Sequence, residues 1–233
     1  MEESRYDRQI LAFGDEGQQK ISKTCIGVVG LGGTGSHIAQ SLAYLGVENY
    51  ILVDDDRVEL TNLNRLVGAF PSDIAAGVLK VDAAKRMIQM IKPEAHVIAT
   101  PRNLRSHEAI DRLTTCTLIF GCVDHDAPRL ILTELCSAYE IILIDCASEI
   151  IIEDNTVQEF GGRVVVAQPG DFCLCCANQV DMNIAREELE SRETKELRKQ
   201  HGYGLGEQMK APAIISVNGV VANLAVTGVT PID

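Results

Sequence analysis

The stretch CIGVVGLGGTGSHIAQSLAYLGVENYILVDDDRVELTNLNR, residues 25–65, decides the fold class of this chain. An apolar strand signal at 26–30 leads into a glycine-rich turn, and a helix signal follows at 34–46. Gly30, Gly32 and Gly35 have the G-x-G-x-x-G spacing, with Gly33 in the same turn. Glycine permits the tight turn and lets backbone N–H groups approach phosphate oxygens at a helix N-terminus. The stretch therefore predicts a nucleotide-binding loop.

An acidic residue follows at the expected place. Asp54 lies 19 residues after Gly35, at the end of the apolar run 49–54. A carboxylate at the end of the second strand hydrogen-bonds ribose hydroxyls in dinucleotide-binding folds. Glycines that serve only helix–strand packing are the alternative interpretation. The loop and its acid do not choose between NAD and ATP.

Strand and helix signals alternate over most of the chain. The expected strands are 26–30, 49–54, 95–100, 117–122 and 141–146, and the expected helices between them include 77–94, 106–116 and 127–140. This order predicts an α/β, Rossmann-like, doubly wound and mainly parallel sheet. Residues 156–170 predict two antiparallel strands interrupted at Gly161 and Gly162, as an extension on one edge. Residues 211–229 predict a helix of small residues suited to close packing.

Composition narrows the class of protein. The 233 residues include 21 basic and 33 acidic side chains, a net charge of −12, which disfavours nucleic-acid binding because that leaves a basic footprint. No apolar run approaches the roughly 20 residues of a membrane span. The charged start MEESRYDRQI lacks the apolar middle of a signal peptide, so we expect a cytoplasmic protein without a membrane partner.

Four further residues favour ATP over NAD. Asn62 and Arg65 follow the acid within a short loop, and Lys80 opens the next expected helix. A triphosphate under attack needs cations to hold its developing negative charge, whereas a pyrophosphate bridge can rest on backbone amides. Asp124 follows an expected strand, where a carboxylate can hold Mg²⁺ against phosphates. Taken singly, each of these residues is more simply a solvated surface charge.

At this point the sequence resembles the ubiquitin-activating-enzyme superfamily, and within it the MoeB/ThiF adenylyltransferases. RYDRQ, GLGGTGS, VDDDRVELTNLNR, LKVDAAKR and GCVDHDAPR match its successive motifs in order. The resemblance implies a homodimeric adenylyltransferase that uses ATP and Mg²⁺. Its substrate would be the C-terminal glycine carboxylate of a ubiquitin-like or sulfur-carrier protein that ends in Gly-Gly, activated as an acyl-adenylate. The implied organisation is one adenylation domain, 1–233, with an N-terminal helical segment 1–24 and a crossover loop at about 177–210.

The same resemblance assigns roles to single residues. The loop glycines would cradle phosphates, and Asp54, assisted by Asp56, would bind ribose. Asp124 would hold the metal, and Arg8 would reach as an arginine finger into the site of the other subunit. The residues that would contact the triphosphate are Asn62, Arg65 and Lys80.

Two features depart from the family pattern. Cys173 and Cys176 have the C-x-x-C spacing of a zinc half-site, but no cysteine follows Cys176 to complete four ligands. We expect a half-site retained without metal or completed by another segment. Residues 177–210 also contain no cysteine, so we expect adenylation without a loop thioester, and Cys175 is a poor candidate nucleophile. His201 is expected to be a surface histidine.

Other functions remain alternatives. An NAD-dependent oxidoreductase would share the glycine loop and Asp54, but it leaves Arg65, Lys80 and Asp124 without a role. A ThiF-type enzyme could instead adenylate a small molecule or a tRNA, although the acidic charge disfavours tRNA. A non-catalytic scaffold would not need the full set of charged residues.

Overall fold

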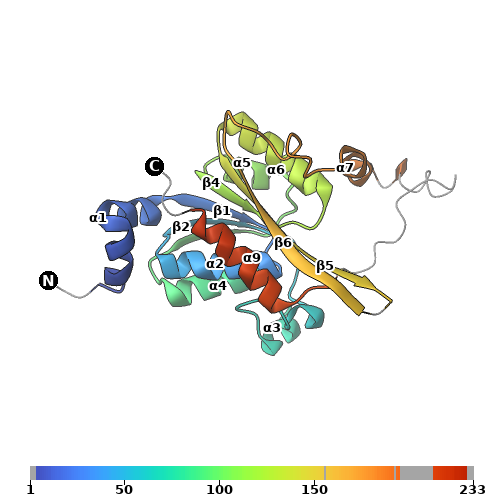
Figure 1. Cartoon of the computed structure of the whole chain (residues 1–233). Coiled ribbons are helices and arrows are strands. Elements are labelled where there is room, and N and C mark those ends of the chain that lie inside the picture. The colour runs from blue at the N-terminus through green and yellow to red at the C-terminus, as the bar shows by residue number, and fades with distance from the viewer. Residues whose placement is uncertain (1–3, 155, 192, 195–211, 230–233) are drawn as a thin grey trace.

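The computed structural model describes residues 4–154, 156–191, 193–194 and 212–229. The elements are α1 (Asp7–Lys23), β1 (Cys25–Val29), α2 (Gly33–Leu45), β2 (Asn49–Val53), the 3₁₀ helix η1 (Leu60–Asn62), α3 (Pro71–Ala75), α4 (Lys80–Ile91), β3 (His96–Thr100), α5 (His107–Leu113), β4 (Leu118–Gly121), α6 (Asp126–Tyr139), β5 (Ile142–Glu153), β6 (Thr156–Ala167), α7 (Met182–Leu189) and α9 (Ile215–Thr227). Helical segments separate the strands from β1 to β5, β6 follows β5 directly, and α7 and α9 come after the last strand (Figure 1).

One six-stranded sheet forms the centre, with the strand order β3-β2-β1-β4-β5-β6. The first five strands are parallel, and β6 pairs antiparallel with β5. The chain winds outward from β1 to β3 and then returns to β4 on the other side of β1. This order is that of a Rossmann-type sheet, in which ligands bind beyond the carboxyl ends of the strands where the winding reverses. The predicted α/β fold with an antiparallel edge is confirmed.

The central strands are apolar on both faces because helices cover both sides of the sheet. Successive side chains of a strand point to opposite faces. Accordingly Tyr50 and Leu52 of β2 belong to one core, and Ile51 and Val53 belong to the other. The runs that lacked polar alternation in the sequence are therefore the strands buried on both sides.

Two groups of helices cover the two faces. Helices α2, α4 and α9 contribute to the first core, and α5 and α6 contribute to the second (Figure 1). Helix α9 comes from the far end of the chain but packs on α2, β5 and β6. It carries small residues at this contact, including the buried Ala222 and Ala225, so it lies close to the glycine loop that opens α2.

The prediction of two strands broken at Gly161 and Gly162 is wrong. Residues 156–167 form one continuous strand, in which Gly161 pairs with Glu149 and Gly162 with Ser148. A Cβ atom on Gly162 would lie 2.7 Å from the carbonyl oxygen of Ala147 and would overlap a side chain of α9. This glycine therefore permits close packing of α9 on the hairpin, and it does not make a turn.

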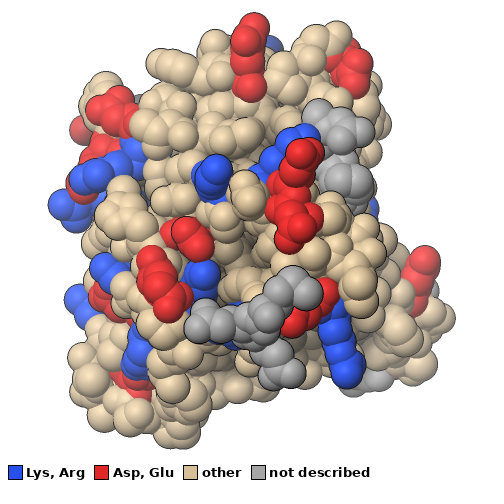
Figure 2. All heavy atoms as spheres, turned by 90° about the vertical axis from the view of Figure 1, so that its left-hand side faces the viewer, with Lys and Arg blue, Asp and Glu red and all other residues tan. Residues whose placement is uncertain are grey.

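The charges of the surface are mixed. Figure 2 shows acidic and basic side chains interspersed over the face that carries α1. Within the described ranges, no helix combines the length and the apolar character needed to cross a bilayer.

Candidate functional site

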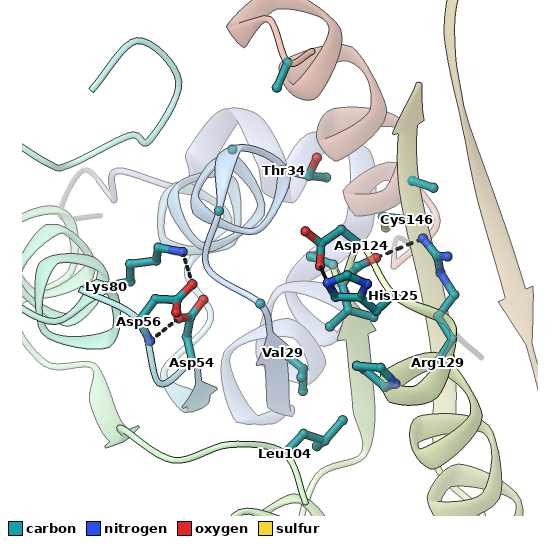
Figure 3. A pocket seen from close by; sticks show the side chains of 18 of the residues that line it. Val29, Thr34, Asp54, Asp56, Lys80, Leu104, Asp124, His125, Arg129 and Cys146 are labelled. Carbon is teal, nitrogen blue, oxygen red and sulfur yellow. Dashed lines mark hydrogen bonds and ion pairs between the residues drawn. The ribbon is translucent and has the colours of Figure 1, made fainter. Parts of the chain in front are cut away.

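A cavity of about 1560 Å³ opens beyond the carboxyl ends of the parallel strands (Figure 3). It lies beyond the neighbouring strands β1 and β4, where the winding of the chain reverses, which is the position at which this class of sheet binds ligands. Most of the predicted site residues line it. They are Gly30, Gly32, Gly33, Asp54, Asp56, Asn62, Arg65, Lys80 and Asp124.

The glycine loop needs glycine for steric reasons. Gly30 has a φ of +84°, and a Cβ atom there would lie 2.5 Å from the carbonyl oxygen of Cys122. At Gly35 a Cβ atom would overlap the carbonyl oxygen of Gly30. Gly35 does not line the cavity, so it permits the packing of α2 on the loop, while Gly32 and Gly33 form the cavity wall.

Asp54 lies at the end of β2 and ties together two turns of the chain. Its Oδ2 accepts the N–H of Leu31 at 2.6 Å, and its Oδ1 accepts the N–H of Asp56 at 2.9 Å. Burial raises the pKa of Asp54 above its usual value, while Lys80 and these two N–H groups act in the opposite direction. Each carboxylate oxygen has a second lone pair that a ribose hydroxyl can use.

Lys80 is held at the same wall of the cavity by two contacts with Asp56. Its Nζ forms an ion pair with Asp56 Oδ2 at 2.6 Å, and its backbone N–H donates to the carbonyl of Asp56 at 2.9 Å. Asn62 accepts the N–H of Glu59 through its side chain at 3.2 Å. Arg65 donates to the carbonyl of Thr61 at 2.5 Å. The predicted basic residues therefore converge on the cavity wall beside the glycine loop.

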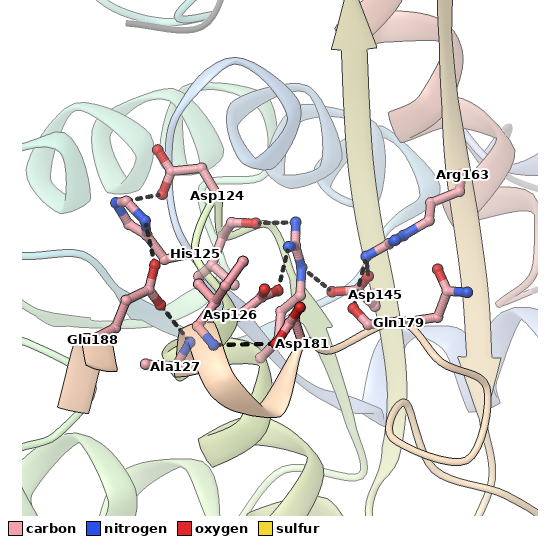
Figure 4. Close-up of polar contacts among 12 residues, drawn as sticks. Asp124, His125, Asp126, Ala127, Asp145, Arg163, Gln179, Asp181 and Glu188 are labelled. Carbon is pink, nitrogen blue, oxygen red and sulfur yellow. Dashed lines mark hydrogen bonds and ion pairs between the residues drawn. The ribbon is translucent and has the colours of Figure 1, made fainter. Parts of the chain in front are cut away.

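Asp124 lies on the loop between β4 and α6. Its side chain is 93% exposed and contacts His125, with 3.7 Å between Oδ1 and Nε2. His125 Nδ1 lies 3.1 Å from Oε1 of Glu188, whose Oε2 accepts the N–H of Ala127 at 2.7 Å (Figure 4). Sequence reasoning missed His125 and Glu188 because α7 approaches α6 only in the folded chain.

Asp124 suits a magnesium ion better than the acidic cluster at Asp54–Asp56 does. Carboxylate oxygens of all three cluster residues come within 4.8 Å of one another. Four carboxylate oxygens of this cluster already accept protein donors from Leu31, Asp56, Lys80 and Asn103. Asp124 is exposed within the cavity, and one carboxylate together with substrate phosphates is a usual Mg²⁺ site.

A buried charge cluster at the floor of the cavity was not predicted. Asp145 on β5 is 1% exposed and lies between two arginines. Arg129 Nε is 3.4 Å from its Oδ1, and Arg163 Nη2 is 3.1 Å from its Oδ2. Arg129 also donates to the carbonyl of Val123 at 2.9 Å. The cluster therefore joins the β5–β6 hairpin to the loop that carries Asp124.

Removing the central acid of this cluster should destabilise the protein. In Asp145→Ala, Arg163 loses this ion pair and Arg129 keeps the 3.3 Å ion pair with Asp126, so we expect unfolding to become easier by about 3 kcal/mol, the lower end of the range for a broken buried pair. Urea denaturation followed by circular dichroism measures the change. Asp171→Ala, at an exposed position, is the matched control. A midpoint equal to that of the wild-type protein would contradict the structural role.

Asn218 was also missed. It is 3% exposed on α9, accepts the hydroxyl of Ser148 at 2.9 Å, and lines the cavity. A Cβ atom on Gly33 would overlap its side chain. The run 213–227 also contains the polar residues Ser216, Asn223 and Thr227, so nothing in the sequence singled out Asn218.

Two predicted sites, Arg8 and the cysteine pair, lie away from the cavity. Arg8 is exposed on the first turn of α1 and does not line the cavity of its own chain. Cys173 and Cys176 lie together after β6, with 3.4 Å between their sulfur atoms. Hydrogen bonding from the backbone of Cys176 lowers the pKa of Cys173. The position of His201 lies outside the described residues.

Comparison with known proteins identifies relatives of similar sequence. Ubiquitin-like modifier-activating enzyme 5 of Aedes aegypti is 29% identical over 172 residues, which cover 68% of this chain and 41% of the relative. The same-named enzyme of Drosophila ananassae is 31% identical with the same coverage. Adenylyltransferase and sulfurtransferase MOCS3 of Drosophila virilis is 30% identical over 162 residues, covering 69% of this chain and 35% of the relative. The chain thus spans about two fifths of the length of these relatives.

Solved structures share the fold. The crystal structure of E. coli MccB with MccA-N7isoASN superposes with a TM-score of 0.73, and the match covers 97% of this chain. The structure of MccB with ATP superposes with a TM-score of 0.71, and the match covers 98% of this chain. Both matches have 22% sequence identity and cover 63% of the MccB chain. The PaaA structure superposes with a TM-score of 0.60 at 23% identity, covering 98% of this chain and 74% of PaaA. The ThiF family matches residues 6–231. This match spans nearly the whole chain, and the glycine loop, Asp54, Lys80 and Asp124 line one cavity. The chain therefore belongs to the ThiF family.

Proposed function

We propose that the protein is an ATP-dependent adenylyltransferase that activates the C-terminal glycine carboxylate of a ubiquitin-like or sulfur-carrier protein ending in Gly-Gly. The convergence of the glycine loop, Asp54, Lys80, Arg65 and Asp124 on one cavity carries this proposal. Relatives named as ubiquitin-like modifier-activating enzymes and adenylyltransferases support it.

The proposed reaction requires positioning and charge neutralisation. The loop N–H groups would bind phosphate oxygens, and Asp54 would accept ribose hydroxyls. A carboxylate oxygen of the carrier attacks the α-phosphorus, the bond to the bridging oxygen breaks, and pyrophosphate leaves. Lys80 and Arg65 would compensate the charge that develops on the leaving group. Asp124 would hold Mg²⁺, which when bound neutralises phosphate charge and orients the phosphates.

We further propose a cytoplasmic homodimer in which Arg8 of one subunit completes the site of the other. All eight cysteines are free thiols, which suits a reducing compartment. Helix α9 exposes Val220 and Leu224 four residues apart, and the neighbouring strand β6 exposes Phe160. These apolar side chains support a face for a second subunit.

The activity can be tested by ATP–pyrophosphate exchange. We expect exchange to appear only when a carrier with a C-terminal Gly-Gly is added, because the carrier carboxylate must attack before pyrophosphate forms. A carrier lacking the last glycine is the matched control. If ATP binds and no Gly-Gly carrier supports exchange, the assigned substrate is wrong.

Nucleotide preference separates this function from an NAD-dependent oxidoreductase. We expect ATP with Mg²⁺ at about 100 times its dissociation constant to raise the melting temperature by about 5–10 °C. NADH at the same concentration should have little effect, because the contacts proposed for Arg65, Lys80 and Asp124 are with a triphosphate and its Mg²⁺, which NADH lacks. Differential scanning fluorimetry measures both. Greater stabilisation by NADH than by ATP would favour the oxidoreductase.

A further inference from the structure

The last turn of helix α7 lines the cavity and is attached there to two other segments of the chain through Glu188. Both carboxylate oxygens of Glu188 contact the start of α6, at the N–H of Ala127 and at the ring of His125. The backbone carbonyl of Glu188 accepts a hydrogen bond from Arg105, on the loop before α5, at 2.7 Å. The Glu188 side chain is only 13% exposed. This helix therefore joins two of the loops that follow the parallel strands.

The start of α6 also determines where Asp124 lies. The loop from 122 to 126 carries Asp124 and is held on the inner side by Arg129, which donates to the carbonyl of Val123. Glu188 holds the other end of the loop by capping the N-terminus of α6. Its second contact fixes the ring of His125, which lies beside the Asp124 carboxylate. Without Glu188, both the backbone after Asp124 and the neighbouring ring lose a fixed contact (Figure 4).

We propose that Glu188 is a positioning residue that orients Asp124 for Mg²⁺ through His125 and the first turn of α6. This inference rests on the proposed function of the cavity. It also assigns a role to the crossover region, since α7 belongs to the described part of 177–210 and its Glu188 lines the cavity. Partners that hold metal-binding groups in place typically change metal affinity about 10–100-fold when they are removed.

The test compares three variants. Glu188→Ala removes both contacts, and we expect it to raise the Mg²⁺ concentration for half-maximal pyrophosphate exchange about 10–100-fold. Glu188→Gln keeps an oxygen for Ala127 and an N–H for His125, so its Mg²⁺ dependence should stay close to that of the wild-type protein. Arg186→Ala, on an exposed side chain of the same helix, is the control and should not change it. Equal Mg²⁺ dependence in Glu188→Ala and Arg186→Ala overturns the proposal.

A second measurement does not depend on catalysis. The rise in melting temperature caused by ATP is measured with Mg²⁺ and with a chelator. In Glu188→Ala the Mg²⁺-dependent part should disappear while the part caused by ATP alone remains. Loss of both parts in Glu188→Ala and Glu188→Gln would show a merely structural role and overturn the proposal. If the wild-type protein shows Mg²⁺-dependent stabilisation by ATP but no carrier-dependent exchange, the proposed substrate is wrong. The melting temperatures of the Glu188 variants then decide the role of Glu188 without the exchange assay.

Discussion

Replacing Asp124 with asparagine is expected to lower carrier-dependent ATP–pyrophosphate exchange by about 10²–10³-fold. The substitution keeps the shape of the side chain but removes the charge that would hold Mg²⁺ against the phosphates. The side chain is 93% exposed, so the free energy of unfolding should change by less than about 0.5 kcal/mol. Exchange of labelled pyrophosphate into ATP, followed over a range of Mg²⁺ concentrations, measures the effect.

The control for this variant is Asp171→Asn, at an exposed position outside the cavity. It matches the change in charge and should leave exchange at the wild-type rate. An Asp124→Asn enzyme that exchanges at the wild-type rate and with wild-type Mg²⁺ dependence would remove Asp124 from the metal site. A large loss of thermal stability would show instead that the loop depends on the Asp124 charge for folding.

Replacing Arg8 with alanine is expected to lower exchange even further, by about 10³–10⁵-fold, which is the range for an arginine finger in phosphoryl transfer. Arg8 is exposed and does not line the cavity of its own chain, so the loss should occur without unfolding. Circular dichroism checks the fold, and exchange kinetics checks the rate. Lys20→Ala, at another exposed basic position of α1, is the matched control.

Mixing two inactive variants tests whether Arg8 acts in the neighbouring subunit. Arg8→Ala and Asp124→Asn chains are combined, unfolded together and refolded. If the finger acts between subunits, about a quarter of the wild-type rate should return, because half of the random dimers are mixed and each contains one intact site. No recovery would indicate that Arg8 and Asp124 act in the same chain, or that the protein does not dimerise.

Local pattern was enough to place the central elements. The expected helix at 34–46 is α2, Gly33–Leu45, and the expected strand at 49–54 is β2, Asn49–Val53. A glycine-rich turn after one strand and an acidic residue at the end of the next strand predict a nucleotide-binding loop in any chain with this order of elements. The positions of Asp54 and Asp124 could be predicted together because both follow the carboxyl ends of parallel strands, which meet at one edge of the sheet, whereas Lys80 opens helix α4.

Local pattern was misleading where a residue serves a distant segment. Gly161 and Gly162 resemble a break between strands, yet both lie within β6, where Gly162 permits the close packing of α9. Gly35 matches the phosphate-binding pattern, yet it contacts the backbone of Gly30 and does not line the cavity. Where a glycine is required because space is short, as at Gly35 and Gly162, the sequence does not say which neighbour takes that space.

The sequence by itself determined the fold class through the periodicity of neighbouring residues, and the family through the resemblance of its successive motifs. The same motifs named the set of charged residues at the carboxyl edge of the sheet. Only the tertiary structure decided the supports around that set: Asp145 between Arg129 and Arg163, and Glu188 at the start of α6. Glu188 and Ala127 are 61 residues apart in the chain. Contacts of this kind arise when packing of the two cores brings distant elements together, and no local pattern encodes that approach.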